Sequence, residues 1–310
     1  MSSQVTGMAP ELSVATRQDL SEAAPLRRHN RLEAWMFVIP AFLFQLIWGW
    51  YPLVVAFILS FTDAQPILPS KFTGVASYRH ILGDPLALRS LQTTIEYAAL
   101  SIVLTFFIPI LVAILLMEMP PRVMRWMMLL WFLPLSTIAS TILWRYVYDQ
   151  NVGIFQYIAT AVLHLPPQPF LNDPKTVLFW IIFPSVLLFG PGLFYMASLQ
   201  GIPSSYYEAA EVEGAGFWRK IWTISLPRLR PIISMLLIFS IIGSLQDFAF
   251  PQILTGGDPG GASRLVVMYM YELLQDQRLS DATALAILLF FVIMFFVILS
   301  RLLIKEDPDA

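Results

Sequence analysis

The side chains best placed to do chemistry in this chain lie inside an apolar run. Residues 231–254 carry one charge, Asp247, and Ser240, Gly243 and Ser244 precede it by seven, four and three positions. In a helix this spacing puts all four on one face. A carboxylate at the bilayer centre costs about 2.5–3.5 kcal/mol, so it faces protein or water. This face could hydrogen-bond the hydroxyl groups of a solute. Alternatively, Asp247 pairs with another chain or caps an unwound turn, and the small residues only let helices pack closely.

Catalytic and metal-binding chemistry is not indicated. The chain has no cysteine, and its three histidines, at positions 29, 80 and 164, are far apart in the sequence. It has neither a GxxxxGK[ST] phosphate-binding loop nor a recognisable nucleophile–base pair. A net charge of −2 argues against nucleic acid as a partner. We therefore expect no catalytic residue, no metal, no cofactor and no enzymatic activity in this chain.

Most of the chain is apolar enough to be embedded in a membrane. Hydrophobic residues make up 57% and charged residues 13% of the 310 residues, whereas soluble domains carry about 25% charged residues. At about 20 residues per span, the apolar runs predict six transmembrane helices in an all-α membrane protein. The runs are 34–62, 97–117, 126–144, 176–207, 231–254 and 282–300. A signal peptide is the alternative for the first run, but its 29 uncharged residues exceed a signal core, so we expect it to span the membrane.

The positions of lysine and arginine predict the orientation in the membrane. With the N-terminus inside, twelve of the 19 basic residues fall in inner segments. The seven on the outer side are Lys71, Arg79, Arg89, Arg145, Lys175, Arg264 and Arg278. This bias predicts that both termini and the loop 201–230 are cytoplasmic. We expect an N-terminal tail over 1–32, a six-span domain over 33–305 and a C-terminal tail over 306–310.

A charged segment, residues 208–227, lies between two apolar runs and reads EAAEVEGAGFWRKIWTISLP. Ser204 or Ser205 as N-cap predicts the start of a helix. Three glutamates would then fall in its first turns, where the helix dipole favours negative charge, and an Arg-Lys pair follows at the other end. Gly214 permits a sharp change of direction. We predict a short helix on the membrane surface that fits a groove on a partner; a solvated amphipathic surface helix is the alternative.

The residue order in this segment resembles the EAA loop of permease subunits of binding-protein-dependent ABC importers. The matching positions are Glu208, Ala209, Ala210, Gly214, Ile224, Leu226 and Pro227. The resemblance implies a type I ABC importer permease fold in the bacterial cytoplasmic membrane, with this loop in contact with an ATPase. It also implies the partners: a second permease in a heterodimer, two ATPase subunits that bind ATP and magnesium, and an extracytoplasmic solute-binding protein.

Other stretches resemble the first permease of carbohydrate-type heterodimers, as in maltose and glycerol-phosphate systems. They include Thr255-Gly256-Gly257-Asp258-Pro259, Tyr269-Met270-Tyr271-Glu272 and Asn151-Val152-Gly153. In that family, solute contacts come from the middle of spans four and five. The contacts implied here are Ser240, Ser244 and Asp247, near a break at Gly190. The chain departs from the family at Thr93-Thr94, where Asn-Thr is frequent, and it lacks the extra spans and large outer domain of the maltose permease.

The charges along the predicted path favour a neutral solute. The middles of spans four and five hold no Lys, Arg or His, and Asp247 would repel an anion at low dielectric. Aromatic rings there, such as Phe239, offer apolar faces to a sugar. We expect import of a neutral di- or oligosaccharide or glycoside, with a non-sugar or anionic solute such as a phosphorylated polyol as the alternative. An ATP-independent secondary transporter is a further alternative, although it has no reason to carry an EAA loop.

Overall fold

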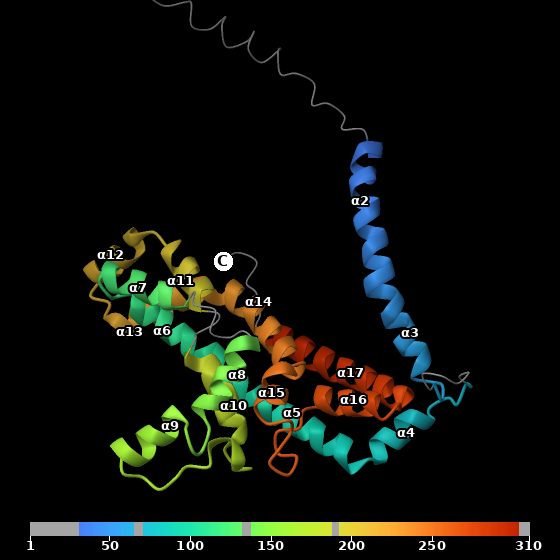
Figure 1. The fold of residues 1–310 in the computed structure, drawn as a ribbon. Coiled ribbons are helices and arrows are strands. Elements are labelled where there is room, and N and C mark those ends of the chain that lie inside the picture. Colours follow the sequence, from blue (N-terminus) through green and yellow to red (C-terminus); the bar gives the residue numbers. More distant parts are fainter. Residues whose placement is uncertain (1–30, 65–70, 132–137, 188–191, 304–310) are drawn as a thin grey trace, which may run out of the picture. The chain divides into compact units, whose positions relative to one another are not determined.

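A computed structural model describes residues 31–64, 71–131, 138–187 and 192–303. The chain divides into two units, residues 1–56 and 57–310, and each is described by itself. In the described residues the regular elements are helices, apart from one isolated antiparallel bridge between Thr62 and Phe72 (Figure 1). The all-α class expected from the sequence is therefore confirmed for these ranges.

The first unit contains one continuous helical stretch. α2 spans Arg31–Gln45, the π-helical turn η2 spans Leu46–Trp50, and α3 spans Tyr51–Leu59. No residue of η2 or α3 is buried, and Trp48 is 71% exposed. The apolar part of this stretch, Val38–Leu59, is long enough to cross a membrane, and a helix that is apolar all round suits such a span.

The second unit contains the remaining elements. Its α-helices are α4 (Ala76–Gly83), α5 (Pro85–Ile102), α6 (Ile108–Met117), α7 (Pro121–Trp131), α8 (Ile138–Val147), α9 (Ile154–Tyr157), α10 (Val177–Leu187), α11 (Gly192–Gln200), α12 (Ser204–Val212), α13 (Phe217–Lys220), α14 (Leu226–Leu245), α15 (Ala249–Leu254), α16 (Val266–Gln275) and α17 (Leu279–Leu303). Short π-helical or 3-10 turns join some of them: η3 (Val103–Phe107), η4 (Ile158–Val162), η5 (Phe170–Asn172) and η6 (Ile221–Ser225).

Four helical stretches in the described residues are long and apolar enough to cross a membrane. They are Val38–Leu59, Pro85–Met117, Phe217–Leu254 and Leu279–Leu303, which correspond to predicted spans one, two, five and six. The second starts at Pro85 rather than at residue 97. The runs predicted as spans three and four each include residues outside the described ranges, 132–137 and 188–191, so the count of six stays a prediction. The predicted tails, 1–32 and 306–310, also lie almost wholly outside the described residues.

Two apolar clusters mark opposite ends of the second unit. One contains Leu116 at the end of α6 together with Leu229 near the start of α14. The other contains Ala87 near the start of α5 and Leu245 at the end of α14. The stretch α5–η3–α6 therefore runs antiparallel to α14. Residues 208–227, which lead into α14, lie at the first of these ends, and α4, α5 and α16 meet at the other (Figure 1).

Span five is interrupted at Asp247. α14 ends at Leu245, and α15 begins at Ala249. In a continuous helix the amide of Pro251 would bond to the carbonyl of Asp247, but proline has no N–H and its ring clashes with that carbonyl. The run 231–254, predicted as one span, therefore forms two helices, and Asp247 lies in the break between them.

Polar side chains at the start of α5 and along it accept hydrogen bonds from backbone N–H groups at the N-termini of two helices, α5 and α16. The Asp84 carboxylate accepts hydrogen bonds from the N–H of Leu86, at 2.9 Å, and from the hydroxyl of Tyr269, at 2.5 Å. Burial by itself would raise the pKa of Asp84, but these two hydrogen bonds lower that pKa below its ordinary value. The Thr94 hydroxyl accepts the N–H of Val266, which opens α16, at 2.8 Å. The Thr-Thr pair of this chain thus has a structural use.

We expect Asp84→Ala to lower the melting temperature of the purified permease complex by about 2–4 °C, because an N-cap contributes about 1 kcal/mol. Asp84→Asn is the matched control, because asparagine caps helices as well as aspartate and keeps an acceptor for Tyr269. Thermal melts in detergent followed by circular dichroism measure the difference. Equal melting temperatures for the two variants would contradict this account of the α5 start.

Candidate functional site

The EAA segment, residues 208–227, has two helical parts, and the first of them is formed by α12. The predicted serine N-cap is wrong, because Ser204 is already helical. The N-cap residue is Pro203, which has an extended backbone conformation (φ −58°, ψ 136°), and no side chain caps this end of the helix. The predicted gathering of acidic residues in the first turn is also wrong, because that turn contains none. Glu208 lies in the middle of α12 and Glu211 near its end, so the helix dipole does not explain their positions.

The turn after α12 is closed by a Schellman motif. The N–H of Gly214 donates to the carbonyl of Glu211 at 2.9 Å, and the N–H of Ala215 donates to the carbonyl of Ala210 at 2.8 Å. This pattern requires a left-handed residue after the helix, and Gly214 has φ +76°. The predicted change of direction is confirmed. The spacing from Ala210 to Gly214 in the EAA pattern is the spacing that this closure needs.

The second helical part of the EAA segment, formed by α13 and η6, contacts α12 and leads into α14 at the start of span five. Lys220 in α13 pairs with Glu211 of α12, with 2.8 Å between Nζ and Oε1. The hydroxyls of Tyr207 in α12 and Ser225 in η6 lie 3.1 Å apart and form a hydrogen bond. Between the two parts lies a pocket of about 200 Å³, and its lining includes the Glu211–Lys220 and Tyr207–Ser225 pairs. The two helical parts of the EAA segment are therefore held together at the start of α14.

The remaining residues of the EAA pattern join this unit to the core. Leu226 and Pro227 are the first residues of α14, where the fixed φ of proline suits a helix start. Leu226 packs against the apolar cluster that holds Leu229. Ile224, in η6, is half-buried.

The outer face of the EAA segment is apolar and exposed. Glu208 and Ala209 are exposed, and so are three large apolar side chains of the same segment. Val212 is 90% exposed, Trp218 66% and Trp222 69%. Large exposed apolar groups rimmed by charge are typical of a surface that docks on another protein.

The structure brings only some of the candidate solute-contact residues to an accessible position. Ser240 and Asp247 are half-buried, whereas Ser244 is buried and its hydroxyl donates to a carbonyl of its own helix at 3.2 Å. Asp247 accepts a hydrogen bond from the hydroxyl of Tyr97 in α5 at 2.5 Å. Gly190 lies outside the described residues. Contact of these residues with solute stays a prediction.

The loop after span five holds itself in place with its own side chains. The Thr255 and Ser263 hydroxyls lie 2.7 Å apart, and Ser263 donates to the carbonyl of Asp258 at 2.7 Å. Gly256 and Gly257 both have positive φ, which explains the two glycines of the pattern. In the described ranges, no group of three His, Cys, Asp or Glu is arranged to hold a metal ion.

Comparison with known proteins gives the family. Residues 99–305 match the model of the binding-protein-dependent transport system inner membrane component, and the chain belongs to this family. It is 31% identical to the sulfoquinovosyl glycerol transport system permease protein SmoG of Agrobacterium fabrum, over 76% of each chain. It is 28% identical to the trehalose/maltose transport system permease protein MalF of Thermococcus litoralis, over 85% of this chain and 90% of the relative.

The fold is that of ABC importer permeases. A chain of a bacterial alginate ABC transporter, solved in complex with an alginate pentasaccharide-bound periplasmic protein, superposes with a TM-score of 0.76 at 21% identity. The match covers 89% of this chain and 96% of the other. The type I permease fold implied by the EAA segment is confirmed.

Several contacts of the site were not anticipated from the sequence. Tyr97 and Asp247 are 150 positions apart, and nothing in the spacing of either indicates the other. The pairing of Glu211 with Lys220 follows only once the turn is known, because it brings residues nine positions apart together. The sequence did contain a signal for the turn, because a glycine four residues after the second alanine of the pattern predicts a Schellman closure.

We expect Gly214→Ala to reduce transport several-fold at unchanged membrane levels, because the left-handed conformation costs a non-glycine residue about 1–2 kcal/mol. Gly216→Ala is the matched control, since Gly216 has φ −69°. No atom lies within 4 Å of a Cβ at either position, so the pair separates backbone strain from lost space. Uptake and ATPase assays on the reconstituted complex measure the effect. Equal activity of the two variants would contradict the required turn.

Proposed function

We propose that this chain is the permease subunit of an ABC importer that moves a sugar across the bacterial cytoplasmic membrane, driven by ATP hydrolysis in partner subunits. The single observation that supports coupling best is the closed EAA segment. An exposed helix, α12, is tied to the base of α14 by the Glu211–Lys220 pair and the Tyr207–Ser225 hydrogen bond. Force applied to α12 by an ATPase would therefore reach span five directly.

The choice of a sugar rests on the relatives and on the polar groups of the spans. One relative is named for trehalose and maltose and another for sulfoquinovosyl glycerol, so sugars of different charge occur among them. At the level of the Tyr97–Asp247 contact, Glu96 is exposed on α5 and hydrogen-bonds Gln92 at 2.8 Å, and Gln246 is exposed beside Asp247. These groups can bind hydroxyls, and the two acids would repel an anion. We therefore favour a neutral di- or oligosaccharide or glycoside over a phosphorylated polyol.

The partners follow from the same surfaces. Exposed polar side chains within a span, such as Gln92 and Glu96, are costly in lipid, which supports a second permease or a water-filled path against this face of α5. The exposed apolar groups around α12 support an ATPase at the other end. The two ATPase subunits would carry ATP and magnesium. An extracytoplasmic binding protein would deliver the solute, as the bound periplasmic protein of the alginate transporter suggests.

Orientation is tested by single cysteines, because the chain has none. We expect Ser205→Cys in α12 to be labelled by a membrane-impermeant maleimide only from the cytoplasmic side, and Gln275→Cys in α16 only from outside. Both positions are exposed, unlike Ser263 in the outer loop, which is fully buried. Labelling of both cysteines from one side would overturn the proposed topology.

Solute preference is tested by uptake into proteoliposomes that hold the whole complex and its binding protein. We expect a neutral oligosaccharide to be imported faster than a uronate oligosaccharide of the same length. Asp247→Asn should narrow the difference, because it removes a negative charge from the path while keeping an acceptor for Tyr97.

Two results would contradict the proposal. A preference for the anionic sugar that Asp247→Asn leaves unchanged would exclude the neutral-sugar assignment. Uptake that continues with no copurifying ATPase and no ATP would favour an ATP-independent secondary transporter instead.

A further inference from the structure

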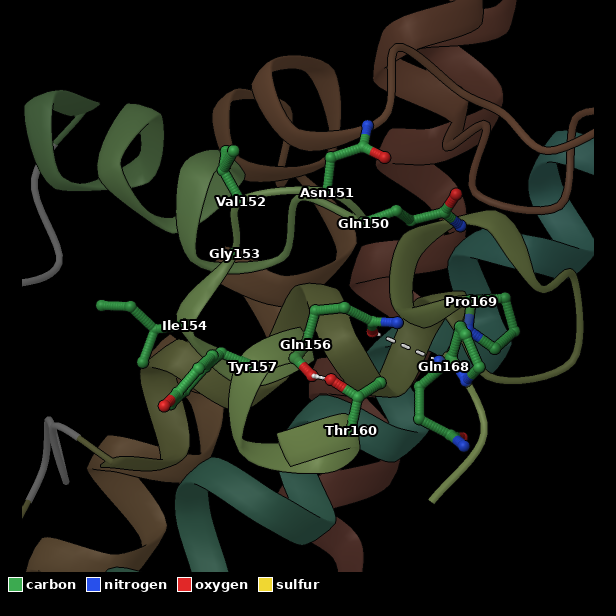
Figure 2. A pocket seen from close by; sticks show the side chains of 11 residues that line it. Gln150, Asn151, Val152, Gly153, Ile154, Gln156, Tyr157, Thr160, Gln168 and Pro169 are labelled. Carbon is green, nitrogen blue, oxygen red and sulfur yellow. Dashed lines mark hydrogen bonds between the residues drawn. The ribbon is translucent and has the colours of Figure 1, made fainter. Parts of the chain in front are cut away.

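A pocket of about 780 Å³ lies in the loop between α8 and α10, away from the spans that carry the predicted solute contacts. It is lined by eleven residues from the tight turn after α8, from α9 and η4, and from a proline-rich stretch (Figure 2). None of the eleven is charged. Neither the EAA segment nor the predicted path explains this pocket.

The first wall of the pocket is built by a tight turn that requires glycine. The Asp149 carboxylate accepts the N–H groups of Asn151 and Val152 at 2.8 and 3.0 Å. A Cβ on Gly153 would lie 2.2 Å from the carbonyl oxygen of Asp149, so only glycine fits. The turn leaves the amide side chains of Gln150 and Asn151 exposed on the pocket wall (Figure 2). This explains the glycine of the Asn-Val-Gly pattern physically.

The opposite wall is fixed by one buried amide. Gln156 of α9 is 6% exposed, and its Oε1 accepts the backbone N–H of Gln168 at 3.2 Å. The Thr160 hydroxyl donates to the backbone carbonyl of Gln156 at 2.8 Å (Figure 2). In the described parts of the chain, the Nε2 of Gln156 has no hydrogen-bond partner. It lines the pocket as a free donor that is already held in position.

The chemistry of these walls selects a ligand class. Four side-chain amides and the hydroxyls of Tyr157 and Thr160 line the pocket. An amide offers both donors and acceptors, which matches a hydroxyl group, which also donates and accepts. Tyr157, which is 67% exposed, and two prolines line the pocket, so apolar faces are present for the C–H surface of a pyranose ring. Without any charge, an ionic ligand gains nothing here.

The pocket also connects toward the rest of the protein. A second pocket, of about 350 Å³, shares Gln150 and Asn151 with it and reaches Leu254 and Thr255. These residues end α15, which begins directly after the break at Asp247. Gln150 and Asn151 of this turn therefore belong to the walls of two pockets, and the second pocket reaches the C-terminal end of α15.

We propose that the uncharged pocket is an outer subsite that binds a neutral, hydroxyl-rich unit of the transported oligosaccharide. Its role in transport rests on the proposed function, whereas binding of a sugar to the pocket does not. A bound sugar chain would lie across Gln150 and Asn151 and extend along the second pocket toward Asp247.

The test is direct binding of maltotetraose to the whole complex in nanodiscs, without ATP and without the binding protein. We expect Gln150→Leu to weaken binding about 5- to 10-fold, because one or two hydrogen bonds are lost at similar side-chain size. The matched control is Gln275→Leu, an exposed glutamine at the end of α16 that should leave binding unchanged. Absence of maltotetraose binding to the unaltered complex, or equal binding by both variants, would overturn the proposal.

Two further measurements separate the rival outcomes. Gly214→Ala, in the EAA segment, should leave this binding unchanged even though it reduces uptake, so failure of the proposed transport function is distinguished from failure of the subsite. Docking of the sugar-free binding protein should be the same for Gln150→Leu and the unaltered complex. Weaker docking, with maltotetraose binding unchanged, would mean that the pocket receives a segment of the binding protein, and the sugar subsite would be rejected.

Discussion

A helix end inside or beside a bilayer leaves backbone N–H and C=O groups that lipid cannot satisfy. This constraint explains several features of the permease. Asp84 caps α5, and Thr94 reaches across the chain to the N–H that opens α16. The Schellman closure at Gly214 ends α12. In each case a polar side chain or a glycine stands at a helix terminus, and these termini determine where the functional segments lie.

The same constraint gives the proposed mechanism a mechanical basis. Once the turn at Gly214 is closed, the Glu211–Lys220 pair and the Tyr207–Ser225 hydrogen bond make α12 and the base of α14 move together. α14 then continues without interruption to Leu245. The backbone of span five first leaves the helical conformation at Gln246 and Asp247. In alternating access, displacement of α12 would therefore be transmitted through α14 to the residues around the Tyr97–Asp247 contact, where the helix can bend.

The sequence predicted those elements whose signals are local. The apolar runs predicted the spans, and the EAA pattern predicted a helix, a turn at Gly214 and a surface for a partner. The serine N-cap failed because Pro203 supplies the extended residue itself, so that Ser204 enters the helix directly. The break at Asp247 was predictable from Pro251, four positions later, but hydrophobicity alone hides it. Contacts such as Tyr97–Asp247 join residues 150 positions apart, and only the packing of antiparallel spans brings them together.

The order of polar environments along the chain matters for a transporter, because each site must bind solute without retaining it. The outer pocket offers amides and hydroxyls without charge, the adjoining pocket adds Arg145, Asp149 and Asp258, and Asp247 lies at the break in span five. Net hydrogen bonds contribute about 0.5–1.5 kcal/mol each, so an open pocket with a few of them holds a sugar weakly. Weak contacts spread over several subsites favour an extended neutral glycan over a small anion, since a glycan can exchange one set of contacts for the next as it advances.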